Sequence, residues 1–138
     1  MNSEIESARA KGVLLVEDSA TQAIMTEALL DDVDSFELLE IVNDGLQAMA
    51  YLKREGKYAD ARRPDLVLLD VNMPNKDGME VLQEIRQDAE LRSIKVIMMS
   101  STESEEELAK AHDQGADACI RKPLDADELV KLLESLKS

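Results

Sequence analysis

Aromatic side chains are scarce in this sequence of 138 residues, which contains one Phe, two Tyr and no Trp. A hydrophobic core must therefore be built from aliphatic residues and methionine. The single cysteine, Cys119, excludes an internal disulfide and fits a reducing compartment. No apolar run approaches the roughly 20 residues that a membrane-spanning helix needs, and the polar start of the chain lacks the apolar core of a signal peptide. We therefore expect a cytoplasmic protein that does not enter a membrane.

Basic residues are outnumbered, with 16 Lys and Arg against 30 Asp and Glu and a formal net charge of −14. Nucleic-acid binding needs clustered Lys and Arg, so we expect no direct contact with DNA or RNA. The excess of acid favours cationic ligands, such as a divalent metal, or partner proteins with basic faces. The length suits one domain. We expect residues 1–10 to form a flexible N-terminal segment and residues 11–138 to form that domain.

Five short apolar runs alternate with helical patterns along the chain. They cover residues 13–16, 36–42, 66–69, 96–99 and 116–120. Uninterrupted runs are typical of strands buried on both faces, so the first, third and fourth are predicted to be central. The second and fifth carry polar residues and are predicted to lie at the edges. Right-handed crossovers then favour the order 2-1-3-4-5, so the predicted fold is an α/β doubly wound sheet of five parallel strands with five helices.

The helices between these runs differ in how much apolar surface they can bury. The third and fifth carry a clear stripe of apolar residues at helical spacing. The residues of the first helix that we expect to face the core are Ala20, Ala23, Ile24 and Ala28. The fourth helix, about residues 103–114, offers little beyond Leu108 and Ala111, which makes it a candidate for movement. Its acidic start, which includes Glu107, is interpreted as a solvated helix end.

Three acids follow two strands that are neighbours in the predicted order. Glu17 and Asp18 come directly after the first strand, and Asp70 ends the third. Adjacent strands lie about 4.8 Å apart, and three carboxylates so close repel one another unless a cation neutralises them. Oxygen ligands of this kind suit Mg²⁺. The sequence therefore predicts a magnesium site at this edge of the sheet.

A hydroxyl group and an ammonium group are expected at the same edge. Ser100 ends the fourth strand, and Lys122 lies just beyond the fifth. A carboxylate nucleophile, a metal and two groups that stabilise phosphoryl oxygens are the parts of a phosphoryl-transfer site. From the residues alone, Asp70 can be a nucleophile, a metal ligand or only a cap for the turn that follows its strand.

Four short motifs occur in order on the predicted elements. They are VLLVEDS at residues 13–19, DLVLLDVNMP at 65–74, DG at 77–78 and KP at 122–123. With these motifs the chain resembles the receiver domain of two-component response regulators over nearly its whole length. The combination is specific because the motifs coincide with the predicted strand ends, whereas each motif alone is a weak signal.

The resemblance implies a role for each residue at the predicted sheet edge. Asp70 would accept a phosphoryl group from a histidine kinase or a histidine phosphotransfer protein. Ser100 would act as the switch hydroxyl, and Lys122 would contact the phosphoryl group, with a cis peptide bond before the proline that follows. The residues implied to hold Mg²⁺ are Glu17, Asp18, Asp70 and, through its backbone carbonyl, Asn72.

The resemblance also implies how such a domain signals. Phosphorylation would change its binding to a downstream protein. The long connection before the third strand, residues 51–64, resembles that of small stand-alone receivers associated with bacterial phytochromes. Some of those receivers are dimers, so a homodimer is among the expected partners. Cys119 stands where the family carries an aromatic switch residue, so the usual coupling through an aromatic ring is not expected here.

Two other functions fit the same residues. One is a phosphatase or phosphotransferase that acts through Asp70, and the other is a binding module of the same fold that is never phosphorylated. A phosphatase of this kind usually needs a second acid near the nucleophile to protonate the leaving group. Asn72 stands at that position, two residues after Asp70. We therefore expect a signalling domain and not an enzyme.

Overall fold

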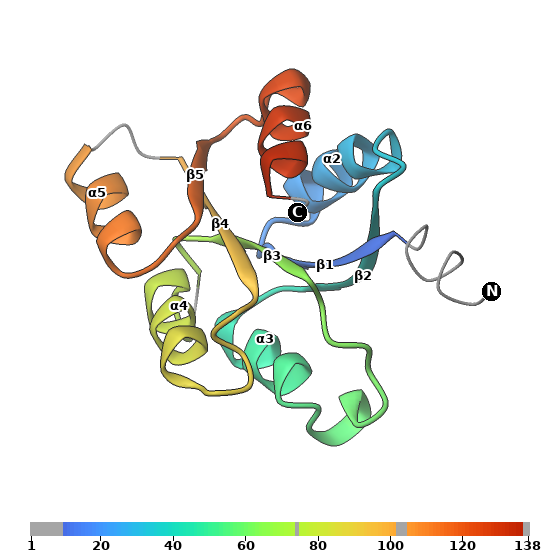
Figure 1. The fold of residues 1–138 in the computed structure, drawn as a ribbon, viewed down its shortest axis with the longest axis vertical. Coiled ribbons are helices and arrows are strands. Elements are labelled where there is room, and N and C mark those ends of the chain that lie inside the picture. Colours follow the sequence, from blue (N-terminus) through green and yellow to red (C-terminus); the bar gives the residue numbers. More distant parts are fainter. Residues whose placement is uncertain (1–9, 74, 102–104, 137–138) are drawn as a thin grey trace.

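Five parallel strands form a single sheet in the order β2-β1-β3-β4-β5 (Figure 1). The computed structural model describes residues 10–73, 75–101 and 105–136. The strands are β1 (Lys11–Val16), β2 (Phe36–Val42), β3 (Leu66–Asp70), β4 (Lys95–Ser100) and β5 (Ala118–Arg121). The predicted strand order and the doubly wound α/β fold are therefore confirmed. The expected N-terminal segment lies outside the described residues except for Ala10, and so does Pro74 of the second motif.

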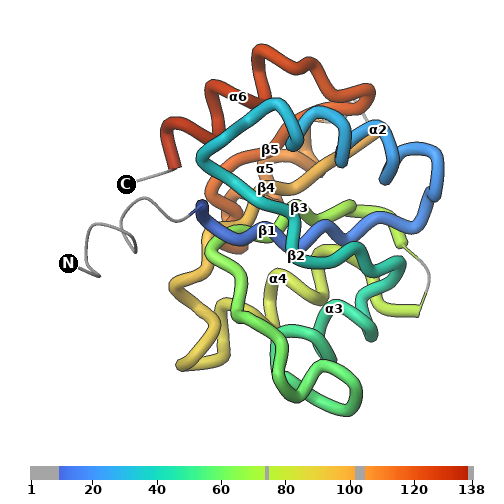
Figure 2. The backbone as a smooth tube through the Cα atoms, turned by 90° about the vertical axis from the view of Figure 1, so that its right-hand side faces the viewer, coloured from blue at the N-terminus to red at the C-terminus, as the bar shows by residue number. Residues whose placement is uncertain are grey.

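Helices cover both faces of the sheet (Figures 1 and 2). In the described part of the chain they are α2 (Ala20–Asp31), α3 (Gly45–Leu52), α4 (Gly78–Gln87), α5 (Glu105–Asp113) and α6 (Ala126–Ser135), with a short 3-10 turn η1 (Gly56–Tyr58). Helices α2 and α6 pack on one face, whereas α3, α4 and α5 contribute to the core on the other. Within the described ranges, no helix combines the length and the apolar character needed to cross a bilayer.

The uninterrupted apolar runs are buried on both faces, as their sequences indicate. Along β1, Leu14 and Val16 join the core under α3 and α4, whereas Val13 and Leu15 join the core under α2 and α6. Strands β3 and β4 divide their side chains between the two cores in the same way, because successive residues of a strand point to opposite faces. The edge strands β2 and β5 contain exposed positions, which confirms their predicted places.

The buried face of α2 differs from the predicted one. Its buried residues are Ala23, Thr26 and Leu30, which recur at i, i+3 and i+7. A helix turns about 100° per residue, so Ile24 lies beside this stripe and is 65% exposed, and Met25 is 57% exposed. Ala20 and Ala28 are exposed as well. The prediction was wrong because Thr26, a polar residue, takes a core position, and α2 is left with an apolar outer surface.

Helix α5 is as weakly buried as the sequence predicts. Ala111 is its one buried residue in the described span, and Leu108 is half-buried. Burial of apolar area is the main stabilising term for a helix in a protein. In the described residues, helix α5 is therefore held by little apolar contact, so its polar contacts matter more for its position.

Candidate functional site

Asp70 is the last residue of β3, a central strand, and its side chain lies at the carboxyl edge of the sheet. Asp70 is 5% exposed, and Glu17, which directly follows β1, is 2% exposed. The backbone N–H of Glu17 donates to Val42 of β2, and that of Val71 donates to Met99 of β4. The sheet hydrogen bonds therefore continue through both acids and hold their backbones at adjacent strand ends.

Glu17, Asp18 and Asp70 form the cluster of acids that the sequence predicts. One carboxylate oxygen from each lies within 4.8 Å of the others, with Asp18 exposed and the other two buried. Burial raises the pKa of the Asp70 carboxyl above its ordinary value, and the neighbouring Glu17 raises it further, while Lys122 opposes the shift. A half-desolvated set of hard oxygen donors on a strand edge is the chemistry that Mg²⁺ prefers, so these residues fit that ion.

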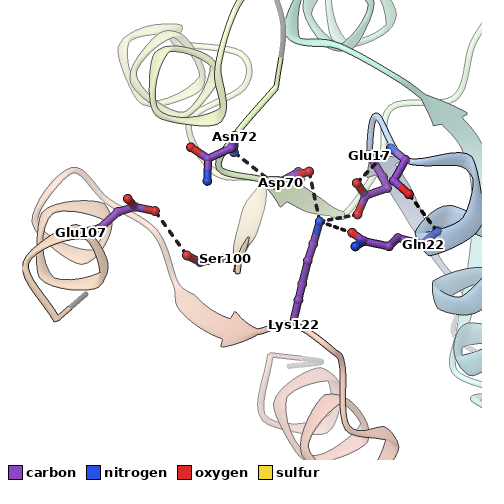
Figure 3. A network of polar contacts seen from close by, with 8 residues as sticks. Glu17, Gln22, Asp70, Asn72, Ser100, Glu107 and Lys122 are labelled. Carbon is purple, nitrogen blue, oxygen red and sulfur yellow. Dashed lines mark hydrogen bonds and ion pairs between the residues drawn. The ribbon is translucent and has the colours of Figure 1, made fainter. Parts of the chain in front are cut away.

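Lys122 supplies the positive charge next to these acids (Figure 3). Its ammonium Nζ lies 3.1 Å from Asp70 Oδ2 and donates to Gln22 Oε1 at 2.6 Å. It also lies 2.7 Å from Glu17 Oε1, an ion pair without the angle of a hydrogen bond. The peptide bond between Lys122 and Pro123 is cis, as expected. Lys122 therefore contacts the carboxylate of Asp70, the predicted nucleophile.

The turn after β3 holds the backbone of Asp70 in place. The N–H of Asn72 donates to Asp70 Oδ1 at 3.1 Å, and the N–H of Gly78 donates to the carbonyl of Val71 at 2.9 Å. A Cβ atom on Gly78 would lie 2.2 Å from the Asp70 carbonyl oxygen, so only glycine permits this approach. Asp77 and Glu80 form a capping box that starts α4 at this point.

Ser100 is buried at the end of β4, but its side chain is directed toward α5 and not toward Asp70 (Figure 3). Its hydroxyl donates to Glu107 Oε1 at 3.2 Å. Glu107 is half-buried, so the interpretation of the start of this helix as solvated was wrong for Glu107, whereas Glu105 and Glu106 are exposed as expected. The predicted hydroxyl does lie at the predicted edge, and it is engaged by a residue of α5.

Sequence reasoning missed two residues of this site, Gln22 and Glu107. Gln22 lies in the first turn of α2, where Ser19 caps the helix by accepting its N–H, and that turn follows the acidic pair directly. Glu107 lies four residues before Ala111, the buried residue of α5, and residues four apart share a helix face. That spacing was the available signal that Glu107 faces the sheet.

Comparison with known proteins agrees with this geometry. The family model described as the response regulator receiver domain matches residues 13–134. The response regulator Rcp1 of Synechocystis sp. is 37% identical over 134 residues, which cover 96% of this chain and 90% of Rcp1.

Two solved structures are similar across nearly the whole chain. The Mn²⁺-bound form of response regulator Rcp1 superposes with a TM-score of 0.78 at 35% identity and covers 93% of this chain and 92% of its own. The phosphorylated cyanobacterial phytochrome response regulator RcpA has a TM-score of 0.77 at 38% identity, and the match covers 94% of this chain and 92% of the RcpA chain. The sequence match, the strand order and the acid cluster agree, and the chain belongs to the response regulator receiver domain family of two-component systems.

Proposed function

We propose that this chain is a stand-alone response regulator that accepts a phosphoryl group on Asp70 and signals through a phosphorylation-dependent change in protein binding. The observation that carries the proposal is the contact between the Lys122 ammonium and the buried Asp70 carboxylate, 3.1 Å apart, beside two further acids. The response regulator Rcp1 is matched over 90% of its length, so a related response regulator consists almost wholly of the part that this chain shares.

The transfer step follows from these contacts. An oxygen of the Asp70 carboxylate attacks the phosphorus of a phosphohistidine, the P–N bond breaks, and the imidazole nitrogen keeps the bonding electrons and takes up a proton. Asn72 N–H holds Oδ1 and Lys122 meets Oδ2, so both oxygens are oriented before attack. Lys122 then offers its ammonium hydrogens to the charge that develops on the phosphoryl oxygens.

The acids around Asp70 would hold the metal that assists this transfer. We propose Glu17, Asp18, Asp70 and the backbone carbonyl of Asn72 as the residues that bind Mg²⁺. When bound, Mg²⁺ neutralises negative charge between the carboxylates and the phosphoryl oxygens. The Mn²⁺-bound form of the related Rcp1 supports a divalent-ion site in this chain.

The phosphodonor must bring its histidine to Asp70, and the surface of α2 offers a docking face. A cavity of about 510 Å³ lies beside Lys122, and its lining includes Met25 of α2 and Pro123. Met25 and the adjacent Ile24 are largely exposed. We propose that a histidine kinase or phosphotransfer protein packs apolar side chains on this face.

A charge placed on this face tests the docking proposal. Met25→Glu should lower the rate of phosphotransfer from a cognate donor and leave labelling by acetyl phosphate unchanged, because the small donor needs no docking surface. Leu46→Glu is the matched control, since Leu46 is 58% exposed on α3, on the other face of the sheet. Equal loss of donor transfer in both variants would refute the proposed location.

The assignment of Asp70 is tested by phosphotransfer with radiolabelled acetyl phosphate and with the histidine kinases of the same cell, in the presence of Mg²⁺. Wild type should incorporate label, and Asp70→Asn should not. Equal labelling of the two proteins would refute the assignment. Turnover of a small phosphoester that Asp70→Asn abolishes would favour the phosphatase instead, and no labelling at all would favour the binding module.

The output of the domain is proposed to be protein binding in the cytoplasm, with a downstream target or a second copy of this chain as the partner. The relatives are signalling proteins such as Rcp1, which supports a role in signalling. Light scattering with and without phosphorylation would measure the homodimer directly. An unchanged mass in both states would refute a phosphorylation-dependent dimer.

A further inference from the structure

The hydrogen bond between Ser100 and Glu107 joins the site to helix α5. Ser100 is fully buried at the end of β4, and its hydroxyl donates to Glu107 Oε1 at 3.2 Å. Figure 3 shows the two side chains directed toward each other, with Asp70 on the other side of Ser100. The hydroxyl of the proposed switch residue thus points away from the proposed phosphoacceptor.

A hydroxyl group has one hydrogen to donate. In the structure Ser100 gives that hydrogen to a carboxylate. A phosphoryl group on Asp70 would bring three further acceptor oxygens and a charge of about −1.5 to −2 to the same edge of the sheet. Ser100 cannot donate fully to Glu107 and to the phosphoryl group at once. The two acceptors therefore compete for one donor.

If Ser100 turned away from it, the Glu107 side chain could move into a neighbouring cavity. A cavity of about 410 Å³ lies between the segment after β3 and helix α5, and Glu107 and Lys110 both line it. Lys110 follows Glu107 by three residues, a spacing at which opposite charges pair on a helix surface. Turning toward Lys110 would keep the carboxylate of Glu107 paired after Ser100 has left it.

This exchange would affect helix α5, because α5 buries little apolar surface in the described residues. Ala111 is its one buried residue in the described span. The Sγ atom of Cys119 lies 3.9 Å from the carbonyl oxygen of Leu108, a weak contact. The hydrogen bond between Ser100 and Glu107 therefore helps to position the first turn of α5.

We propose that Glu107 is a positioning residue that holds the Ser100 hydroxyl away from Asp70 in the resting domain and competes with the phosphoryl group for it. Glu107 thereby lowers the affinity of the site for a phosphoryl group, and its release frees the first turn of α5 to move. This inference rests on the proposed function, since it requires phosphorylation at Asp70.

The test uses beryllofluoride with Mg²⁺ as a stable phosphoryl mimic, and follows its binding by the NMR shift of the amide of Val71, which directly follows Asp70 and is unchanged in every variant. Glu107→Ala should lower the half-saturating concentration of beryllofluoride about threefold to tenfold, the equivalent of one hydrogen bond. Glu107→Gln, whose amide oxygen can still accept the hydroxyl, should restore much of the wild-type value. Glu105→Ala, an exposed acid of the same helix turn, controls for the loss of negative charge.

The decisive comparison is made in a second background. Glu107→Ala should shift the half-saturating concentration in wild type and leave it unchanged in Ser100→Ala, because the competition needs the hydroxyl. Thermal unfolding followed by circular dichroism identifies variants that have lost their fold. Equal shifts in both backgrounds, or an equal shift from Glu105→Ala, would overturn the role of Glu107 and leave the proposed function standing. Wild type that binds no beryllofluoride would overturn both.

Discussion

Replacement of Gly78 by alanine tests how strictly the turn after β3 fixes Asp70, the proposed phosphoacceptor. Gly78 begins α4, and its N–H donates to the carbonyl of Val71 at 2.9 Å. The added Cβ would lie 2.2 Å from the carbonyl oxygen of Asp70 and 2.9 Å from the Cα of Val71. Both contacts are with backbone atoms, so no side chain can turn aside to relieve them.

The magnitude follows from that overlap. Contacts of a Cβ atom shorter than 3.0 Å essentially do not occur, so the turn must open by about 0.8 Å at the Asp70 carbonyl. Overpacking of this kind costs about 1–3 kcal/mol, and alanine returns at most about 0.5–1 kcal/mol as the better helix former. We expect the free energy of unfolding to fall by about 1–2 kcal/mol.

The labelling rate should fall more than the stability, because the displaced atoms belong to Asp70, the proposed nucleophile. A misplacement of about 1 Å can cost a factor of about 100 in rate. We expect Gly78→Ala to be labelled by acetyl phosphate at least about tenfold more slowly than wild type at saturating Mg²⁺.

Urea unfolding followed by circular dichroism measures the stability, and the initial rate of labelling measures the function. The matched control is Gly56→Ala, where a Cβ meets nothing within 4 Å but φ is +58°. That variant should lose about 1 kcal/mol from backbone conformation alone and keep the wild-type labelling rate. Wild-type labelling in Gly78→Ala would refute the claim that the turn positions Asp70.

Three further predictions concern electrostatics and polar contacts. The pKa of Asp70 is raised in the folded state, so the free energy of unfolding falls as pH rises through that pKa. Without Mg²⁺, the Asp70→Asn variant should therefore unfold at a higher temperature than wild type near pH 7. Mg²⁺ should raise the unfolding temperature of wild type, less at pH 5 than at pH 7 and less in Asp70→Asn, as scanning calorimetry can measure. The Arg86 guanidinium donates to three backbone carbonyl oxygens and to the carboxylate of Asp117. Arg86→Ala should therefore lower the free energy of unfolding in urea by about 2–4 kcal/mol and leave the labelling rate unchanged. A loss below about 0.5 kcal/mol, the value typical of an exposed side chain, would contradict this prediction.

The strand order could be predicted because strands that are buried on both faces consist of uninterrupted apolar residues. The segment before Asp70 reads Leu-Val-Leu-Leu without a polar residue, which fits only a strand covered on each side. Once the central strands are known, right-handed crossovers leave few orders for the rest. The positions of Glu17, Asp70 and Lys122 at one edge then follow from the fact that parallel strands end on the same side.

The packed face of α2 was predicted wrongly because its sequence carries two conflicting patterns. Ile24 and Met25 are large and apolar, and they outweigh Thr26 in any reading based on hydrophobicity. The structure buries Thr26 between Ala23 and Leu30 instead. Exposed apolar residues are ordinary on protein surfaces when they are single, but Ile24 and Met25 are adjacent, and Met25 lines the cavity beside Lys122. These exposed side chains are the reason why the docking proposal is placed on the outer face of α2.

The direction of the Ser100 hydroxyl could not be predicted, since a serine side chain can take any of three staggered rotamers. Position along the strand places Ser100 at the edge of the sheet but does not choose between Asp70 and Glu107. The choice depends on which acceptor is charged, near and unsatisfied in a given state. A residue whose partner is set by such a balance is suited to a switch, because a new charge at Asp70 can reverse the choice without repacking the core.

The choice of the Ser100 hydroxyl between Asp70 and Glu107 matters more in this chain because Cys119 replaces an aromatic residue. The resemblance to receiver domains places Cys119 where an aromatic residue would couple the switch hydroxyl to the outer surface. Here the thiol is half-buried on β5, and burial raises its pKa, so it stays neutral at pH 7 and packs as a small side chain. Its Sγ atom makes a weak contact with the backbone carbonyl of Leu108 in α5. The proposed competition at Ser100 would give a signal from Asp70 a shorter path to the outer surface, through the Ser100 hydroxyl to Glu107 and the first turn of α5. That path requires no aromatic ring, which agrees with a sequence that contains only three aromatic residues.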